Sequence, residues 1–294
     1  MPELPEVEVL VRHLRPVLVG KTIRAVSVFR SKVLRPTSVR HLARTLTGAR
    51  FTGVDRRGKY LLFHLERKGA MRPVLVVGHL GMTGRMYLLR RGAPLPKHTS
   101  VALHLGKENF IFEDTRFFGR FTLDAQAIAR LGPEPLAENF TTENLSQALK
   151  RSRQSIKVRL LDQKLVAGVG NIYASEVLFR AGISPMTAAR RLQPEEVARL
   201  RQAIRDVLSE AIACGSTVPL NYAGTGKRDG LFYFGRAPGA PDFYAERLLV
   251  YDRATLPCPI CRSPIRRTVQ AARATYFCPQ CQKGPLRRKT GSQR

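Results

Sequence analysis

Hydrophobic positions near the start of the chain recur with helical spacing. Val7, Leu10, Val11 and Leu14 fall on one face of a helix with 3.6 residues per turn. Two prolines precede them, and proline suits the first turn of a helix. The pattern therefore predicts a helix from the proline-rich start to about Gly20.

Between residues 22 and 124 the pattern changes to short β-like runs separated by glycine, proline and basic turns. In one run Val101, Leu103 and Leu105 share one face, which predicts a strand buried on that face, with Ala102 on the other. A series of short strands predicts a sandwich or a barrel. The clearest runs are 23–29, 60–65, 74–77, 101–105 and 110–112.

A segment punctuated by glycine and prolines, residues 131–136, has the composition of a linker, and helical periodicity follows it. Gly182 and Gly215 stand where C-terminal caps are expected. Residues 216–245, rich in glycine, proline and aromatics, are expected to form a long loop. The predicted helices cover 141–150, 156–165 and 172–180, with a longer one starting at Pro194.

The charge of the chain indicates a polyanionic partner. Fifty Lys and Arg residues against 22 Asp and Glu residues leave a net charge of +28 and a pI near 11.0. Nucleic acid and an anionic membrane surface are the two candidates. No apolar run approaches the roughly 20 residues that span a bilayer, and Glu3, Glu6 and Glu8 differ from the basic start of a signal peptide. Nucleic acid and a cytoplasmic location are therefore favoured.

Four of the five cysteines form two CxxC pairs separated by sixteen residues, and Cys214 stands apart. Two CxxC hairpins can present four thiolates to one zinc ion in a closed, structural site. Two disulfides or redox CxxC motifs are the alternatives, and neither fits a basic cytoplasmic chain. The expected zinc ligands are Cys258, Cys261, Cys278 and Cys281. Arginines between the pairs suit phosphate or groove binding: Arg262, Arg266, Arg267 and Arg273.

The first residues permit two interpretations. Pro2 and Pro5 suit the start of a helix. Alternatively, removal of Met1 exposes the secondary amine of Pro2, which can attack an aldehyde-like carbon to give an iminium ion. A free α-amino group titrates near ~8, so part of it is nucleophilic at neutral pH. Glu3 is then placed to move protons at the reacting centre.

Four further segments each have a structural and a functional interpretation. The glycine turn 168–173 is either a helix corner or an anion site at a helix N-terminus. The basic turn 56–60 is either a solvated hairpin tip or part of a binding surface. In segment 78–84, Met82 is either core filler or a wedge between stacked bases. Segment 114–119 offers an arginine and a phenylalanine two residues apart on a loop, although core packing is the default interpretation of its phenylalanines.

Together these pieces, in this order, resemble the formamidopyrimidine-DNA glycosylase family of bacterial oxidised-purine repair enzymes, from Pro2 to about Lys283. The motifs that carry the resemblance are 1–8, 57–62, 79–84, Lys97-His98, 131–136, 165–176 and the zinc module. The resemblance implies an α+β fold with an N-terminal β-sandwich and flanking helices, a helix–two-turn–helix domain and a four-cysteine zinc finger. The expected domains are the catalytic sandwich 1–130, the linker 131–136, the helix–two-turn–helix domain with a lesion-capping loop 137–247, the zinc finger 248–284 and a basic disordered tail 285–294.

The resemblance also implies roles for single residues. Pro2 would be the nucleophile at the sugar C1′ and Glu3 its acid/base partner. Lys59 and Arg273, counted with them as catalytic, would grip phosphates around the extruded nucleotide. The expected DNA-binding residues are His79, Met82, His98, Arg116, Phe118 and Asn171. Of these, Met82, Arg116 and Phe118 would fill the hole left by the flipped base.

The implied activity is that of a bifunctional DNA glycosylase and AP lyase acting in base excision repair. It would excise 8-oxoguanine and formamidopyrimidines through a Schiff base on Pro2 and cut the strand by β,δ-elimination. The implied partner is double-stranded DNA with oxidised bases or abasic sites. The protein is expected to be a cytoplasmic, nucleoid-associated monomer. It would hold one structural zinc ion, need no nucleotide cofactor and not bind a membrane. The alternatives are an endonuclease VIII-like enzyme for oxidised pyrimidines, against which Leu4 argues, and a non-catalytic zinc-ribbon DNA-binding protein.

Two departures from the family pattern limit this transfer. Phe117 stands where members often carry a second basic residue. The stretch 218–246 matches the lesion-capping loop poorly, although Asn221, Tyr222, Lys227 and Arg228 are compatible with base contacts. The preferred oxidised base is therefore not fixed by the sequence.

Overall fold

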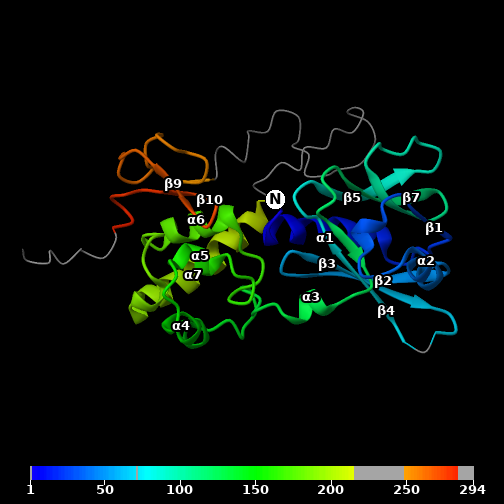
Figure 1. The fold of residues 1–294 in the computed structure, drawn as a ribbon, viewed down its shortest axis with the longest axis horizontal. Coiled ribbons are helices and arrows are strands. Elements are labelled where there is room, and N and C mark those ends of the chain that lie inside the picture. Colours follow the sequence, from blue (N-terminus) through cyan, green and yellow to red (C-terminus); the bar gives the residue numbers. More distant parts are fainter. Residues whose placement is uncertain (1, 71, 215–247, 284–294) are drawn as a thin grey trace, which may run out of the picture. The chain divides into compact units, whose positions relative to one another are not determined.

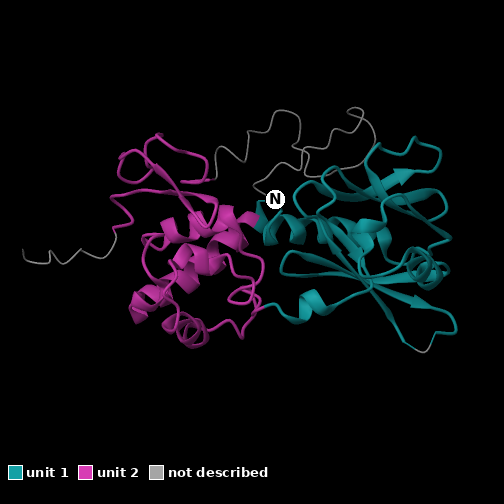
Figure 2. Ribbon diagram, in the orientation of Figure 1, with its two compact units in different colours: residues 1–131, 212–243 teal, residues 132–211, 244–294 magenta. Residues whose placement is uncertain are grey.

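The computed structural model describes residues 2–70, 72–214 and 248–283, and the chain divides into two compact units (Figures 1 and 2). Unit 1 comprises residues 1–131 and 212–243, and unit 2 comprises residues 132–211 and 244–294. The expected cap at Gly215, the loop 216–245 with its four candidate base-contacting residues, and the tail 285–294 lie outside the described residues.

Unit 1 contains two four-stranded antiparallel sheets, which confirms the predicted N-terminal sandwich. The first sheet, in the order β2-β3-β4-β8, consists of Ala49–Arg57, Tyr60–Arg67, Val74–His79 and Arg120–Thr122. The second, in the order β1-β6-β7-β5, consists of Ala25–Val28, Thr99–His104, Glu108–Asp114 and Gly84–Arg90. The helical elements of this unit are α1 (Leu4–Leu18), η1 (Ser31–Leu34), α2 (Val39–Leu46) and α3 (Gln126–Ala129).

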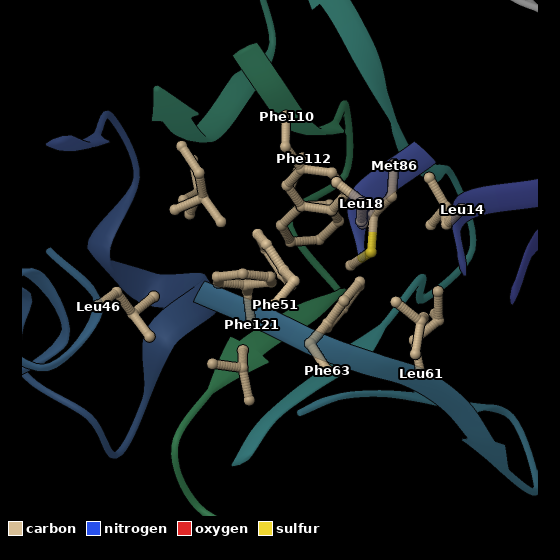
Figure 3. Close-up of a cluster of buried hydrophobic side chains, with 14 of the residues drawn as sticks. Leu14, Leu18, Leu46, Phe51, Leu61, Phe63, Met86, Phe110, Phe112 and Phe121 are labelled. Carbon is tan, nitrogen blue, oxygen red and sulfur yellow. The ribbon is translucent and has the colours of Figure 1, made fainter. Parts of the chain in front are cut away.

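Aromatic side chains from both sheets fill the core of unit 1 (Figure 3). The ring of Phe63 on β3 lies edge-on to that of Phe110 on β7, with their centroids 5.5 Å apart. Leu14 and Leu18 bring the apolar face of α1 to the same cluster. The helix predicted from periodicity is thus confirmed, and the burial of its apolar stripe attaches it to the sandwich.

The structure differs from the sequence prediction within unit 1 at helix α2 and at strand β6, among other places. The helix α2 lies in a stretch expected to be β throughout; Ser38 caps it, and Leu42 and Leu46 bury its short apolar face. Strand β6 is buried on both faces, so the expectation of an uncovered face at Ala102 is wrong. Ala102 packs with Tyr87 and Ile111 of the neighbouring strands in a second, smaller cluster.

Unit 2 is helical and ends in a two-stranded hairpin. Its helical elements are α4 (Thr142–Lys150), α5 (Ile156–Leu160), α6 (Asn171–Arg180), η2 (Ala189–Arg191) and α7 (Pro194–Ala213), and the strands are β9 (Arg266–Gln270) and β10 (Arg273–Phe277). Helix α5 ends five residues before the predicted Leu165, because the Asp162 carboxylate accepts the backbone N–H of Lys164 and forms a turn there. Gly182 has φ +69°, as its predicted capping role requires.

The segment that follows Leu131 is held against unit 2. The N–H of Gly132 donates to the carbonyl of Gln163 at 2.8 Å, and a Cβ at Gly132 would lie 2.2 Å from the carbonyl oxygen of Lys164. Arg205 donates to the carbonyls of Pro135 and Ala137, both at 3.0 Å. Over the described part of the chain, every helix is too short or too polar to cross a bilayer.

Candidate functional site

The N-terminal residues lead directly into α1. Pro2 and Glu3 are buried, and Glu3 is the N-cap of the helix. The backbone N–H of Glu3 donates to the Glu6 carboxylate at 2.7 Å, and the two residues form a capping box. Pro5 occupies the first turn. The helix start therefore fixes the backbone at Glu3, one residue from the Pro2 nitrogen.

Ion pairs hold α1 to β2. The Glu8 carboxylate accepts from Arg12 at 2.8 Å and from Arg56 at 2.9 Å. Burial raises the pKa of Glu8, but the hydrogen bonds from Arg12 and Arg56 outweigh it and leave the pKa below its usual value. About two turns beyond Glu8, Arg15 donates to the carbonyl of Val54 at 2.8 Å. The helix that presents the N-terminus is thus attached at two points to the sandwich.

The basic turn between β2 and β3 is packed, not solvated. Gly58, with φ +55°, opens a two-residue turn, and Lys59 beside it is only 7% exposed. Arg56 donates to the carbonyl of Gly58 at 3.1 Å, and Arg57 donates to the carbonyl of Leu131 at 3.1 Å. The interpretation of this turn as a solvated hairpin tip is therefore wrong. The turn holds the side chain of Lys59 at a fixed position.

His79 lies beside two cations at the end of β4. It pairs with Tyr60 on one neighbouring strand and with Arg120 on the other, and its ring centroid is 4.7 Å from that of Tyr60. Burial, reinforced by Lys59 and Arg120, lowers the pKa of His79 to about 4. The backbone N–H of Gly81 donates to Nδ1 at 2.9 Å, so the proton of the neutral ring is on Nε2. His79 can therefore donate one hydrogen bond through Nε2.

Three of the predicted DNA-binding side chains project from two loops of unit 1. Met82 is 44% exposed and Phe118 is 50% exposed, so the core interpretation fails for both. The guanidinium of Arg116 lies 4.9 Å from the centroid of the Phe118 ring. Between them Phe117 has φ +56°, and its ring faces Arg30 at 5.6 Å. Where family members often carry a second basic residue, this chain thus has an aromatic ring in contact with the Arg30 guanidinium.

His98 lies just before β6 and is half-buried. Its carbonyl accepts the backbone N–H of Asp114 at 3.0 Å, which places it next to the loop that carries Arg116.

The glycine turn before α6 is held by a glutamine from the loop that follows α5. Gln163 accepts the N–H of Gly168 at 2.9 Å and donates to the carbonyl of Val169 at 2.8 Å. Gly168 has φ +88°, and Gly170 is the N-cap of α6. The turn presents Asn171 as the first residue of that helix.

The orientation of Asn171 is set by a buried lysine. Lys157 is fully buried, and its ammonium donates to the Asn171 Oδ1 at 2.8 Å, to the Ala274 carbonyl at 2.6 Å and to the Thr275 hydroxyl at 2.8 Å. An ammonium has only donors, so the amide oxygen of Asn171 faces it and the NH₂ group faces away. Lys157 also ties Asn171 to β10, whose first residue is the exposed Arg273.

A strained turn precedes Arg273. The loop between β9 and β10 consists of Ala271 and Ala272, with φ +46° and φ +58°. Two positive φ values in a two-residue hairpin loop are typical of a type I′ turn, which normally takes Asn or Gly. The geometry positions Arg273 at the expense of backbone strain at two alanines.

The four paired cysteines form a cluster fit for zinc. Their sulfurs all lie within 4.8 Å of one another, with Cys258 and Cys281 3.8 Å apart and Cys261 and Cys278 3.4 Å apart. Zinc–sulfur bonds of about 2.3 Å set a tetrahedral S–S edge of about 3.8 Å, whereas a disulfide requires about 2.05 Å. The disulfide alternative is therefore wrong. Hydrogen bonds from Ser263 lower the pKa of Cys261 to about 6, whereas burial raises the pKa of Cys278 and of Cys281.

The structure gathers the predicted residues into local groups and adds others that the sequence did not single out. Lys59 and His79 form one group, Met82, Arg116 and Phe118 a second, and Asn171 lies near Arg273 in a third. The additions are Arg120, Asp114, Lys157 and Gln163. Asp114 and Lys157 are charged and fully buried, and burial is invisible in a single sequence.

Comparison with known families matches three successive parts of the chain. Residues 1–121 match the formamidopyrimidine-DNA glycosylase N-terminal domain, residues 131–220 match the formamidopyrimidine-DNA glycosylase H2TH domain, and residues 256–284 match a zinc finger found in FPG and IleRS.

Full-length relatives show the same similarity. The formamidopyrimidine-DNA glycosylase of Thermus thermophilus is 44% identical over 293 residues, covering 97% of this chain and 100% of that protein. A Lactococcus lactis FPG mutant in complex with Fapy-dG-containing DNA has a TM-score of 0.84 at 31% identity, covering 96% of this chain and 100% of that one. The Lactococcus lactis Fpg with abasic-site DNA has a TM-score of 0.82 at 31% identity, covering 96% and 99%.

Proposed function

The chain belongs to the formamidopyrimidine-DNA glycosylase family, a family of DNA-repair enzymes, and on that premise we propose that it excises oxidised purines from duplex DNA and cuts the strand at the abasic site. The observation that carries the proposal is the start of α1, where Pro2 and Glu3 precede a capped helix attached to the sandwich by Glu8–Arg56. A similar protein bound to Fapy-dG DNA supports the choice of oxidised purines.

The proposed reaction begins with the secondary amine of Pro2, freed by removal of Met1. Its nitrogen forms a bond to the sugar C1′, and the damaged base leaves with the electron pair of its glycosidic bond. The nitrogen passes its proton to the leaving base, and the resulting N,O-acetal then expels the ring oxygen O4′, which takes a proton, so that an iminium ion remains. Glu3, held at the helix N-cap, is placed to move that proton.

The iminium then makes strand cleavage possible. It acidifies the C2′ proton, whose loss expels the 3′ phosphate, and a second elimination expels the 5′ phosphate. One amine thus serves both the glycosylase and the lyase steps.

Four donors are proposed to hold the phosphates around the extruded nucleotide. These are Lys59, the Nε2–H of His79, the Asn171 amide and Arg273. Because Lys157 directs the Asn171 NH₂ group away from itself, that group is free to donate to an anionic oxygen.

Extrusion of a base costs a few kcal/mol, which must be offset by contacts that the open duplex gains. The exposed side chains of Met82, Arg116 and Phe118 are proposed to fill the space left by the base. His98, close to the same loops, is proposed to contact the DNA backbone.

The zinc ion is structural. The cysteine cluster and the matching zinc-finger family indicate one ion, bound by all four thiolates of the cluster, so it has no position for substrate. It stabilises the hairpin that carries Arg273. We place this DNA-bound enzyme in the cytoplasm, associated with the nucleoid and acting as a monomer, with catalysis in residues 1–130 and DNA binding in 137–247 and 248–284.

A substrate panel tests the proposal. Duplexes containing 8-oxoguanine opposite cytosine, or thymine glycol opposite adenine, are incubated with the protein, and the released base and the strand ends are measured. The expected result is faster release of 8-oxoguanine, with a phosphate on both sides of the gap. Glu3→Gln is expected to slow release, whereas Glu138→Gln, an exposed matched control, is not. Preference for thymine glycol would indicate the endonuclease VIII-like alternative, and binding without release the zinc-ribbon alternative.

A further inference from the structure

The two loops that carry the exposed Met82, Arg116 and Phe118 pack backbone to backbone. We call them the wedge loops: residues 80–83, between β4 and β5, and residues 115–119, between β7 and β8. A Cβ on Gly81 would lie 2.6 Å from the backbone nitrogen of Gly119. No side chain fits at that distance, so glycine allows the two loops to meet.

One buried carboxylate is bonded to both wedge loops. Asp114, the last residue of β7, is fully buried. Its Oδ1 accepts from the Thr83 hydroxyl at 2.7 Å and from the backbone N–H of Arg116 at 3.2 Å. Its Oδ2 accepts from the backbone N–H of Gly119 at 2.8 Å. Thr83 belongs to the first loop, and Arg116 and Gly119 to the second.

The hydroxyl of Thr83 strengthens this connection. It donates to Asp114 and accepts the backbone N–H of Arg116 at 3.2 Å, so a closed set of hydrogen bonds joins the two loops. Hydrogen bonds to an ionised acceptor are about twice as strong as neutral ones, and burial removes the competition of water. The backbone around the three exposed side chains is therefore held before any ligand binds.

We propose that Asp114 is a positioning residue for base extrusion, which couples the wedge loops so that Met82, Arg116 and Phe118 enter the duplex as one unit. Asp114 is buried and does not itself reach DNA. Its effect is to remove the ordering cost that two independently mobile loops would incur on insertion. The inference rests on the proposed function, because it assumes that the three side chains replace an extruded base.

The test is Asp114→Asn. An amide of the same shape has one acceptor and one donor end, so whichever way it is turned its NH₂ group faces an N–H or O–H donor of one loop. Two substrates separate the roles: a duplex with 8-oxoguanine opposite cytosine, which requires extrusion, and a single-stranded abasic oligonucleotide, which does not. We expect duplex excision to fall about tenfold or more, with single-strand cleavage within about twofold of wild type.

A second readout follows insertion directly. A 2-aminopurine placed beside the lesion becomes fluorescent when the stack is opened, and Asp114→Asn is expected to slow this rise in stopped-flow measurements. Asp124→Asn, the same substitution two residues beyond the end of β8, is the matched control, because among the described residues its carboxylate accepts from the local N–H of Gln126 alone. Where Asp114→Asn is too unstable to purify, Thr83→Val cuts the same link and is expected to give the same substrate split.

Three outcomes would overturn the inference: wild-type excision by Asp114→Asn, an equal loss on both substrates, or an unchanged 2-aminopurine rise. Failure of the proposed function is distinguishable. If Met82→Ala with Phe118→Ala excises 8-oxoguanine at the wild-type rate, the wedge assignment itself is wrong, whatever Asp114 does.

Discussion

Three buried charged side chains hold together the backbone segments that carry the candidate site. Asp114 joins the wedge loops, and Lys157 joins Asn171 to β10. Glu176 on α6 accepts three consecutive backbone N–H groups, from Leu249 to Tyr251, at 2.8 to 3.0 Å. Burial raises the pKa of Glu176 and these N–H groups counteract it. In each case a buried charge costs desolvation and is stabilised by several hydrogen bonds.

Lys157→Met tests the role of the buried ammonium. The change removes the donor of three acceptors, of which the Thr275 hydroxyl is buried and the other two are half-buried, and a buried group left unsatisfied costs about 1–3 kcal/mol. We therefore expect a lower midpoint of thermal unfolding and weaker binding of abasic-site duplex, because the Asn171 amide is no longer oriented. Lys164→Met, the same change at an exposed position, is the control for charge alone. Equal behaviour of the two variants would contradict the account.

The protonation of His79 can be followed by NMR of its ring carbons. The folded pKa of about 4 lies below the ordinary 6.5, so the ring is expected to remain neutral at pH 5 to 7. The unfolded chain takes up a proton below pH 6.5, so the contribution of His79 to stability is present above 6.5 and lost as the pH falls towards 4. Lys59→Met is expected to raise this pKa. Titration of wild-type His79 near 6.5 would contradict the assignment.

At the scale of elements, hydrophobic periodicity predicted those helices and strands that bury one face and expose the other. The stripe of α1 and the helices α4 and α7 were found from the sequence, because each buries one side against a core. Helix α6 was also predicted, although its residues 172–179 are all buried. The short helix α2 was missed, because only Leu42 and Leu46 of its residues are buried. The second buried face of β6 depends on Tyr87 and Ile111 of other strands, which local pattern does not contain.

The strained turn before Arg273 predicts a stabilising substitution. A left-handed conformation costs an L-residue roughly 1–2 kcal/mol, and glycine avoids this cost but loses more chain entropy on folding. Ala272→Gly is therefore expected to stabilise the zinc hairpin by up to about 1 kcal/mol. Ala274→Gly, inside β10 where φ is negative, is expected to destabilise it. Thermal unfolding of both variants with zinc bound measures the difference; a destabilised Ala272→Gly would contradict the turn geometry.

The zinc cluster is expected to support the DNA affinity of the hairpin that carries Arg273. Cys261→Ser is expected to lose zinc, measured by metal analysis, and to lose affinity for duplex DNA at the same time, because the hairpin carries Arg273 and three further exposed arginines. Cys214→Ser, outside the cluster, is expected to keep both. DNA affinity that survives metal loss would show that the hairpin is not a DNA contact.

At the scale of the whole molecule, charge and motif order predicted the partner and the family before any geometry. The +28 net charge, the two CxxC pairs and the N-terminal Pro2-Glu3 can all be read directly from the sequence. The additions of the structure are non-local: Arg120 beside His79, Asp114 between two loops and Lys157 beneath Asn171 join residues far apart in the chain. Such contacts have no signature in periodicity or composition, since each partner is unremarkable alone.

The central claim is that the Pro2 amine forms a covalent bond to the sugar. The most direct measurement is borohydride reduction during reaction with 8-oxoguanine or abasic-site duplex, followed by mass spectrometry of the protease-digested adduct. The account predicts a DNA adduct on the N-terminal peptide, on Pro2 with Met1 removed, and its loss in Pro2→Gly with a blocked N-terminus. A wild-type protein that cleaves DNA without an adduct, or an adduct mapped to any lysine, would contradict it.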